Sequence, residues 1–545
     1  MIDEGGFVMR IEGKMHMQSP VSAKRRQAIL PVAILSLVVG LCGTRGQAAT
    51  FDLQTATLAD IQAAMDSGAL TSEKLVQLYL NRIEAYDKKG PKLKAIITLN
   101  PKALEEARTL DAERKTKGPR SQLHGVPVVF KDLIDVAGLP TTAGFIPFGA
   151  PVPTRDATIV ARLRAAGAVM LAKASTANWF GNSDDTHPNG GAPLNPYNVL
   201  HSPGATSNGS AVSLAAYLTA LAIGTDTSAS VQHPAANSSV VGFVATQGMV
   251  SRAGIIPRGA TQDRAGAMTR SVYDATAMFS VIAGWDAEDL ITFRAMGHFP
   301  EGDWSKQLSA TDIQGKRIGV LREMIYDGPA HQPGRAIFER ALEDLRKAGA
   351  YVIDPVLTGI DLKRETLGEL NRTAEYEKTP YTDAYLARLG SAAKFKSVKE
   401  MIETVGPDKF SRGMVTGLEM PPPDESADYL ARYRARDMFI QLIHSTMDKF
   451  ALDALVLPYR TNPPERIDGP RPEESTNNLT SHTGLPAVIV PGGYTDENLP
   501  IGIQFFGRHN TDLTILKIAY GYEQASHRRK APAIAPPLAG ERFEY

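Results

Sequence analysis

The stretch RDATIVARLRAAGAVMLAK, residues 155–173, passes from a helix pattern directly into a strand pattern. Apolar residues recur at helical spacing between Asp156 and Gly167, so we expect a capped helix from Asp156 to Gly167. The apolar run behind it predicts a strand over 168–172. A helix that runs straight into a buried strand is a repeating unit of α/β proteins.

Similar helix-to-strand units recur at 334–356 and around 453–459. The segment GVPVVFKD (125–132) adds a short apolar run that predicts a buried strand ending in charged residues. Strands that are apolar throughout, instead of alternating, belong to sheets covered by helices on both faces. The sequence therefore predicts the fold class α/β, a sandwich with a largely buried sheet.

Amphipathic helices are expected around this sheet. TLADIQAAMDSG and TSEKLVQLYLNRIEAY predict two of them, with Thr57 and Thr71 as N-caps and Gly68 as the residue that ends the first. Residues 285–450 are richer in charge and tyrosine, and they predict a helical cover with variable loops.

The composition bounds the class of protein. Apolar residues make up 43 % of the chain and charged residues 22 %, as in ordinary globular proteins. Lys+Arg and Asp+Glu number 59 each, so no excess charge favours nucleic acid or a cationic partner. No low-complexity linker or internal repeat divides the chain after residue 50, so no boundary between domains is predicted there.

Residues 1–49 predict a leader. A basic cluster, Lys24-Arg25-Arg26, precedes an apolar run from Ile29 that is short for a membrane span but suited to a signal peptide. We expect cleavage near Ala48 or Ala49, a periplasmic or secreted mature protein, and no stable membrane insertion after the leader is removed. A short membrane anchor is the alternative, and the route, Sec or twin-arginine, stays open.

Motifs of several enzyme classes are missing from the sequence. It has no G-x-S-x-G elbow, Walker A loop, H-E-x-x-H motif or G-x-G-x-x-G loop. SAAK (391–394) fits Ser-x-x-Lys without its companion elements, so a polar helix face is expected there. DDTHP (184–188) offers metal-binding atoms without a second histidine cluster, so a solvated loop is expected. We therefore expect no metal and no cofactor.

Hydroxyl residues are concentrated in two segments, SPGATSNGSAV (202–212) and GTDTSASVQHPAANSSVVG (224–242). SLAAYLTALAIG (213–224) joins them and predicts a small-residue helix that brings the two polar loops together at one end of the core. A hydroxyl group needs a base to act as a nucleophile, and no histidine stands in a motif that supplies one. A buried lysine can stay neutral, and Lys131 at the end of an apolar strand is placed for that role.

These segments resemble the amidase signature family, which includes peptide amidases, fatty acid amide hydrolases and the A subunit of the tRNA-dependent amidotransferase. The resemblance implies one catalytic domain over 50–545, a central mixed β-sheet covered by helices on both faces, with core motifs at 120–285 and 450–525. It rests on six segments in order: LHGVPVVFKDLIDVAGLPTTAG, DATIVARLRAAGAVMLAK, SPGATSNGSA, GTDTSASVQHPAA, TQDRAGAMTRSVYDA and TGLPAVIVPGGYTDENLPIGIQFFGR.

In that family a serine attacks the amide carbonyl, a second serine behind a cis peptide bond relays the proton, and a lysine is the final base. Carried over by position, the resemblance makes Ser230 the nucleophile, Thr206 the relay and Lys131 the base. It also implies an oxyanion hole that stabilises the reacting carbonyl oxygen. The backbone N–H groups expected to form it belong to Thr227, Ser228 and Ala229.

The resemblance gives supporting roles to further residues. Ser207 is expected to support the nucleophile by a hydrogen bond, and Asp226 and Asp263 are expected to hold the loops through buried, charge-assisted hydrogen bonds. His201 and His233 flank the two loops. Each is expected to be packed and hydrogen-bonded, with contact to the substrate as the alternative.

The chain departs from the family pattern at the relay. Thr206 replaces a serine and adds a methyl group that restricts the side chain. Ala205 replaces a glycine in a turn where a non-proline cis bond already costs about 3 kcal/mol. In the oxyanion loop, Ser228 and Ala229 stand where the family has smaller residues.

Three interpretations stay open. The first is an active amidase that hydrolyses a carboxylic amide C–N bond through an acyl-enzyme. The second is a weak or silent protein that binds an amide-like ligand, and the third is an esterase that uses the same site.

The expected partner is a small-molecule or peptide amide substrate and not a nucleic acid, and the oligomeric state stays open. NRTAEYEKTPYTDAYLARLG (371–390) resembles the helical cover of the peptide amidase branch of the family. This likeness favours C-terminal peptide amides or aryl amides as substrates.

Overall fold

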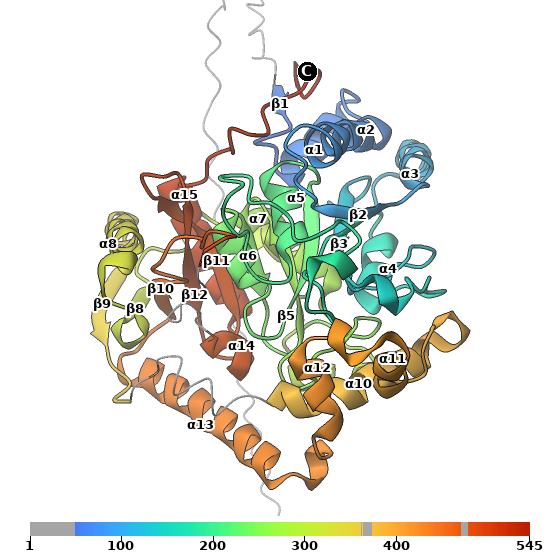
Figure 1. Cartoon of the computed structure of the whole chain (residues 1–545). Helices are drawn as coiled ribbons and strands as arrows, with labels where there is room; N and C mark the ends of the chain where they lie inside the picture. The colour runs from blue at the N-terminus through green and yellow to red at the C-terminus, as the bar shows by residue number, and fades with distance from the viewer. Residues whose placement is uncertain (1–48, 361, 363–372, 470–477) are drawn as a thin grey trace, which may run out of the picture. The chain divides into compact units, whose positions relative to one another are not determined.

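One mixed sheet runs through the centre of the described chain (Figure 1). The computed structural model describes residues 49–360, 362, 373–469 and 478–545, so the predicted leader lies outside the described residues except for Ala49. In this part of the chain, eleven strands hydrogen-bond in the order β2–β4–β3–β5–β7–β6–β11–β12–β10–β8–β9, and a separate pair joins β1 to β13.

The sheet is antiparallel in its middle and has a parallel group of three strands on each side, and the edge strand β2 pairs antiparallel with β4. β3 runs parallel to β4 and β5, and β8 runs parallel to β9 and β10. Because β3 and β5 are parallel neighbours, their carboxyl ends meet at one edge of the sheet. The strands are β1 Thr50–Asp52, β2 Ile96–Leu99, β3 Pro127–Lys131, β4 Val169–Ala174, β5 Leu221–Asp226, β6 Val241–Val244, β7 Arg264–Thr269, β8 Arg317–Leu321, β9 Tyr351–Val356, β10 Ala454–Pro458, β11 Ala487–Tyr494, β12 Pro500–Phe506 and β13 Arg542–Glu544.

Helices cover both faces of this sheet. α5 and α6 pack on each other and on the strands, whereas α4, α7, α15 and α8 contact one another in succession as a second layer. The helices are α1 Leu58–Asp66, α2 Ser72–Arg82, α3 Ala103–Lys117, α4 Thr158–Ala165, α5 Asn208–Ala215, α6 Gln232–Asn237, α7 Val272–Ile282, α8 Gln332–Lys347, α10 Thr373–Leu389, α11 Val398–Val405, α12 Arg412–Thr416, α13 Ala427–Lys449, α14 Leu479–Thr483 and α15 Asp512–Ser526.

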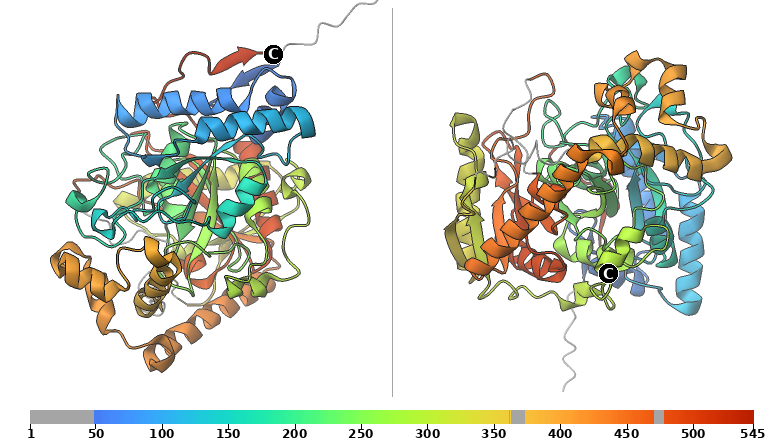
Figure 2. Two further views of the ribbon diagram at one scale, coloured as in Figure 1. Left: turned by 90° about the vertical axis from the view of Figure 1, so that its right-hand side faces the viewer. Right: turned by 90° about the horizontal axis from the view of Figure 1, so that it is seen from below.

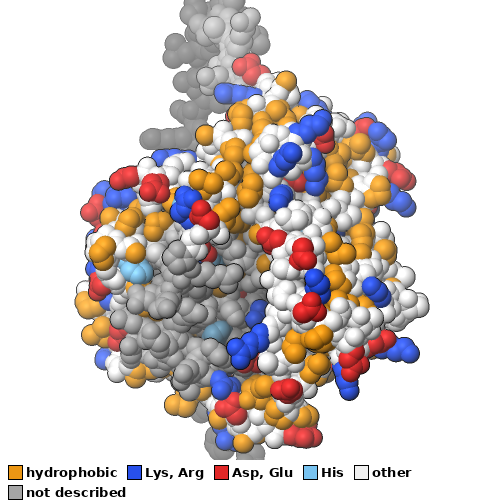
Figure 3. Space-filling model, viewed as in Figure 1, with side chains coloured by type: hydrophobic (Ala, Val, Ile, Leu, Met, Phe, Trp, Pro, Cys, Tyr) orange, Lys and Arg blue, Asp and Glu red, His pale blue; other side chains and the backbone are white. Residues whose placement is uncertain are grey.

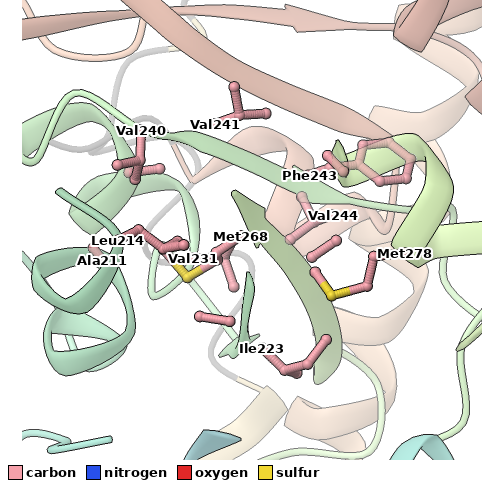
Figure 4. Packing of buried hydrophobic residues seen from close by; sticks show 14 of the residues in the cluster. Ala211, Leu214, Ile223, Val231, Val240, Val241, Phe243, Val244, Met268 and Met278 are labelled. Atoms are coloured by element: carbon pink, nitrogen blue, oxygen red, sulfur yellow. The ribbon is translucent and has the colours of Figure 1, made fainter. Parts of the chain in front are cut away.

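Apolar side chains from both helix layers meet the strands in one core (Figure 4). Leu214 of α5 and Met278 of α7 lie on opposite sides of the strand that carries Met268, and all three are fully buried. Every residue of β5 and β7 is buried as well. The predicted α/β class, with a sheet buried on both faces, is confirmed.

The helix starts follow the capping residues in two cases out of three. Thr57 forms a capping box with Asp60, and the Thr71 side chain accepts a hydrogen bond from Lys74 N at 3.0 Å, as predicted. The expected cap at Asp156 is wrong. Its carboxylate accepts instead from Ala137 N and from Arg164 Nε, each at 2.8 Å, and α4 begins at Thr158.

Two other expectations need correction. Residues 213–224 do not form one helix, since α5 ends at Ala215 and β5 begins at Leu221. A run of small and apolar residues suits a buried central strand as well as a helix, so periodicity alone could not separate the two. Within 285–450, β8 and β9 belong to the sheet, so that range is not only a helical cover.

The remaining helices of 373–449 form the expected cover. α10 packs against α11, α12 and α13, and the group lies at the end of the sheet away from α1 and α2 (Figures 1 and 2). Tyr385 Oη of α10 donates to Asp135 Oδ1 at 2.7 Å, and Arg388 forms an ion pair with the same carboxylate at 3.0 Å. Asp135 follows β3, so the cover is attached directly to the loop behind Lys131.

The surface carries charges of both signs. Acidic and basic side chains are interspersed over the face shown in Figure 3 and do not gather by sign, in keeping with the equal totals in the sequence. Among the described helices, none has the length and apolar character needed to cross a bilayer.

Candidate active site

Lys131 is the last residue of β3 and lies inside the protein with no exposed surface. Its Nζ donates to Thr206 Oγ1 at 2.5 Å and to Thr225 Oγ1 at 2.8 Å. Thr225 belongs to the parallel neighbour β5, so the sheet itself brings these two side chains together. The amine therefore has two hydroxyl partners, and its Nζ also lies 3.4 Å from Thr225 O.

Burial lowers the pKa of Lys131 from 10.5 to about 7, because the charged form loses its hydration. The carboxylates of Asp226 and Asp263 oppose this shift, and the charge of Arg258 adds to it. The ring of Trp179 lies 5.5 Å from Nζ and forms part of the apolar surroundings. At neutral pH the amine is partly in the neutral form that can accept a proton.

Ser230 is half-buried in the loop between β5 and α6. Its carbonyl oxygen accepts from Ser207 N at 3.1 Å, and its own N–H donates to Asp226 Oδ1 at 3.3 Å. Asp226 is buried and also accepts from Gln232 and Ser481, both at 2.9 Å. These bonds fix the Ser230 loop beside the backbone of the residue that follows Thr206.

The backbone of the same loop offers free donors. Among the hydrogen bonds of the described residues, none uses the N–H of Thr227, Ser228 or Ala229. The Thr227 hydroxyl donates to Asp263 Oδ1 at 2.6 Å, and Asp263 Oδ2 accepts from Arg258 N and Gly259 N. The loop is thus anchored by its side chains and keeps its N–H groups available for an anionic oxygen.

The hydroxyl of Ser207 bonds to the backbone of Thr225 and not to Ser230. It donates to Thr225 O at 3.1 Å and accepts from Thr225 N at 3.2 Å. Gly204, with φ +102°, lets the same loop approach closely, because a Cβ there would lie 2.9 Å from Pro234 N. The two loops are therefore joined by main-chain contacts on both sides of Thr206.

The expected cis bond before Thr206 is wrong for this structure. In the described part of the chain, the cis peptide bond is Asp354–Pro355, so Ala205–Thr206 is trans. A non-proline cis bond is costly, and Ala205 has a Cβ where the family has glycine. Thr206 Oγ1 reaches Lys131 Nζ from the trans backbone.

A cavity of about 250 Å³ opens beside these residues. Thr225, Thr227, Trp179 and Asp263 line it, together with Tyr381 of α10 in the helical cover. The cavity is bounded by the catalytic loops and by the helical cover together. It is large enough for a small acyl or amine group.

The SAAK and DDTHP motifs and His233 make contacts within the fold. Lys394 of SAAK is exposed and donates to Pro147 O at 3.3 Å, and His187 of DDTHP is buried with Nε2 2.8 Å from Thr176 O. His233 is bonded to Arg460, and burial together with that charge holds the pKa of His233 well below its usual range. Within the described residues, no cluster of three or more His, Cys, Asp or Glu could hold a metal.

Sequence reasoning missed Thr225 and Trp179. Thr225 precedes Asp226 in the quoted GTDTSAS segment, and its place on β5, parallel to β3, is the signal that could have found it. Trp179 follows β4 in a loop with no recognisable motif. Its approach to Lys131 arises only in the folded chain.

Comparison with known proteins gives the family of the chain. A model of the amidase family matches residues 74–516. The chain belongs to the amidase family. A probable amidase of Arabidopsis thaliana is 31 % identical over 516 residues, which cover 91 % of this chain and 95 % of that protein. The A subunit of a glutamyl-tRNA(Gln) amidotransferase of Bdellovibrio bacteriovorus is 30 % identical over 496 residues, covering 87 % and 98 %.

Solved structures of this family have the same fold. The native peptide amidase of Stenotrophomonas maltophilia has a TM-score of 0.79 and 35 % identity to this chain, over 88 % of this chain and 99 % of that one. The chain is accordingly a C–N hydrolase of the amidase family with one α/β domain built on a large mixed sheet.

Proposed function

We propose that the protein hydrolyses the C–N bond of a carboxylic amide through an acyl-enzyme on Ser230. Ser230 Oγ attacks the carbonyl carbon, its proton passes to Thr206 Oγ1, and the Thr206 proton passes to neutral Lys131 Nζ. The C–N bond then breaks as the proton returns through Thr206 to the leaving amine, and water hydrolyses the ester. The observation that carries this proposal is the 2.5 Å bond between Lys131 Nζ and Thr206 Oγ1.

The neutral lysine is the chemical requirement of this scheme. With a pKa of about 7, roughly half of Lys131 is neutral at pH 7, which suits a group that takes a proton and gives it back. The second hydroxyl partner, Thr225, keeps Nζ directed at the relay.

The oxyanion of the tetrahedral intermediate would be held by the N–H groups of Thr227, Ser228 and Ala229. Removing one such donor costs about a hundredfold to a thousandfold in other acyl-transfer enzymes. Support comes from the fixed loop, since Asp226 and Asp263 hold its two ends by side-chain hydrogen bonds.

Linear amides, and peptide amides first among them, are the substrates we propose. The support is the likeness to peptide amidase structures, one of which is a complex with the competitive inhibitor chymostatin and is 35 % identical to this chain. Tyr381 of the helical cover also lines the 250 Å³ cavity, so the cover is in a position to contact the substrate.

The test compares purified wild type with Ser230→Ala on matched amides, esters and carbamates. We expect amide hydrolysis by wild type and none by Ser230→Ala, with an unchanged melting temperature. Hydrolysis of esters alone would make the protein an esterase. No turnover and no labelling by a fluorophosphonate would make it a silent binding protein.

We also propose that the mature protein is exported after loss of residues 1–49. The support is the order of the basic cluster, apolar run and small residues in the leader. Fractionation of cells that express the full chain, with N-terminal sequencing, should find the protein outside the cytoplasm with a new N-terminus near Ala49. An uncleaved chain in the cytoplasm would contradict this.

A further inference from the structure

An ion pair without exposed surface lies one residue from Lys131. It joins Lys173 of β4 to Asp132, the residue that follows β3, and Lys173 Nζ lies 2.9 Å from Asp132 Oδ1. Because β3 and β4 are parallel neighbours, the sheet itself brings the two side chains together. The reaction proposed above uses neither of them.

Burying two charges in this way is expensive, because both ions lose their hydration. In other proteins, well-packed apolar residues in place of such a pair often give an equal or higher stability. Stability alone is therefore a weak reason for this pair. The groups that the two side chains hold in place are a better guide to its role.

The pair holds a short segment of chain that comes after β3. Asp132 Oδ2 accepts from Thr142 N at 3.0 Å and from the Thr142 hydroxyl, and Lys173 Nζ donates to Thr141 Oγ1 at 3.0 Å. The carbonyl oxygen of Asp132 accepts from Ala143 N at 3.1 Å. Each of the three residues of this segment is therefore bonded to one member of the pair.

The same segment holds Trp179. Ala143 O accepts from Trp179 N at 3.0 Å. Ala143 has φ +56°, a left-handed conformation that is unfavourable for alanine, so the bonds around it determine this backbone. The centre of the Trp179 ring lies 5.5 Å from Lys131 Nζ. Through Ala143, the ion pair thus fixes the backbone that carries the indole ring beside the amine.

We propose that the Lys173–Asp132 pair positions Trp179 against the amine of Lys131 and so keeps water away from it. The inference rests on the proposed function, because it takes Lys131 to be the base. Among the hydrogen bonds of the described residues, none joins either member of the pair to the amine or to the two hydroxyl groups of the site. Both are positioning residues.

The direction of the effect on Lys131 separates positioning from electrostatics. Burial lowers the pKa of Lys131 to about 7. The charges that act on it are the carboxylates of Asp226 and Asp263 and the guanidinium of Arg258. Removing the whole ion pair takes away one charge of each sign, so the net charge near the amine does not change. Water admitted beside the amine would stabilise its protonated form and raise the pKa.

The test compares wild type with Asp132→Asn/Lys173→Met, which has lost both charges. The acid side of the pH profile of kcat/KM for a peptide amide should shift upward by about one pH unit. As a fraction of the wild-type value, kcat/KM should then be about tenfold lower at pH 6 than at pH 9. Trp179→Leu should shift the profile in the same direction. The matched control, Arg82→Met/Glu541→Gln, removes the buried ion pair between α2 and the residue before β13, and it should leave the acid side unchanged.

An NMR titration of protein labelled with ¹³C at Cε of lysine measures the pKa of Lys131 without turnover. Loss of one signal in Lys131→Met identifies that residue, and the signal should titrate at higher pH in the variant without the pair. Thr142→Val, which breaks one bond to Asp132 and keeps both charges, should give a smaller shift of the same sign. It decides the question should the double variant fail to fold.

An unchanged acid side together with an unchanged NMR titration in a folded variant would overturn the proposal, and so would a downward shift. A loss of kcat/KM by the same factor at every pH would do so as well, because it is the result expected of a merely structural pair. A wild type that hydrolyses no amide would overturn the proposed function, whereas the NMR titration would still decide whether the pair keeps the amine out of water.

Discussion

Replacing Lys131 with methionine separates the catalytic role of the buried amine from its effect on stability. Lowering the pKa from 10.5 to about 7 corresponds to about 5 kcal/mol, at about 1.4 kcal/mol for each tenfold change in proton affinity. This is the free energy by which the protein interior disfavours the protonated amine, relative to the neutral amine, compared with water. Methionine has a similar length, carries no charge and avoids that cost.

The sign of the stability change follows from proton binding. Between about pH 7 and 10.5 the unfolded chain binds a proton that folded Lys131 does not, so wild-type stability rises with pH over this range. The cost of burying Lys131 is therefore largest at and below pH 7. Lys131→Met should raise the free energy of unfolding by a few kcal/mol at pH 6, somewhat less than the full 5 because Thr206 and Thr225 lose a partner, and by little at pH 10.

The same substitution should remove activity. Loss of the base should lower kcat/KM for a peptide amide about a thousandfold or more. In wild type, kcat/KM should fall tenfold per pH unit on the acid side of about pH 7, as Lys131 becomes protonated. The assays are ammonia release between pH 5 and 9 and urea unfolding at pH 6, 8 and 10.

Two results would refute this reasoning. One is a wild-type rate that is flat from pH 5 to 8, since it would mean that no group near pH 7 must lose a proton. The other is a Lys131→Met protein with kcat/KM within tenfold of wild type. A Lys131→Met protein with a lower free energy of unfolding than wild type at pH 6 would contradict the predicted cost of burying the charged amine. It would not contradict the role of Lys131 as the base.

Three further predictions concern the relay, the oxyanion loop and the cover. Thr206→Val keeps the shape of the side chain but loses the hydroxyl, so kcat should fall about a hundredfold or more. Thr206→Ser keeps the hydroxyl and should keep or raise kcat. Equal kcat values for the two variants in the amide assay would show that Thr206 does not take part in the reaction. Thr227→Val breaks the 2.6 Å bond to Asp263 and should lower kcat more than it raises KM, while an effect on KM alone would place the loop in binding only. Tyr385→Phe leaves the buried carboxylate of Asp135 with one hydrogen-bond donor fewer, so urea unfolding should show a free energy of unfolding about 1–3 kcal/mol lower. An unchanged free energy of unfolding would mean that the bond from Tyr385 to Asp135 does not stabilise the contact between the helical cover and the loop after β3.

The buried strands and two of the helix starts were predictable from the sequence, because local residue patterns determine them. The run from 155 to 173 and the apolar strand of 125–132 predicted the buried strands β4 and β3, since a sheet covered on both faces needs strands without polar alternation. Thr57 and Thr71 marked helix starts because a cap is a local hydrogen bond. Asp156 failed because its carboxylate is bonded by Ala137 and Arg164, which the sequence does not place near it.

Lys131 could be proposed as a base from its place at the end of an apolar strand, but the nucleophile and the relay were predictable only through the resemblance. Ser230, Thr206 and Lys131 came from ordered motifs, and the bond from Lys131 to Thr206 depends on a register between β3 and β5 that no single segment encodes. The same is true of Thr225 as the second partner of the amine. The trans bond before Thr206 went against the family pattern, although Ala205 in place of glycine had pointed to a difference at that turn.

Peptide mapping after reaction with a fluorophosphonate tests the central claim most directly. The account predicts one adduct on Ser230 in wild type, formed much more slowly in Lys131→Met, and no adduct in Ser230→Ala. An adduct on another serine or threonine, or one on Ser230 that forms as fast without Lys131, would contradict it.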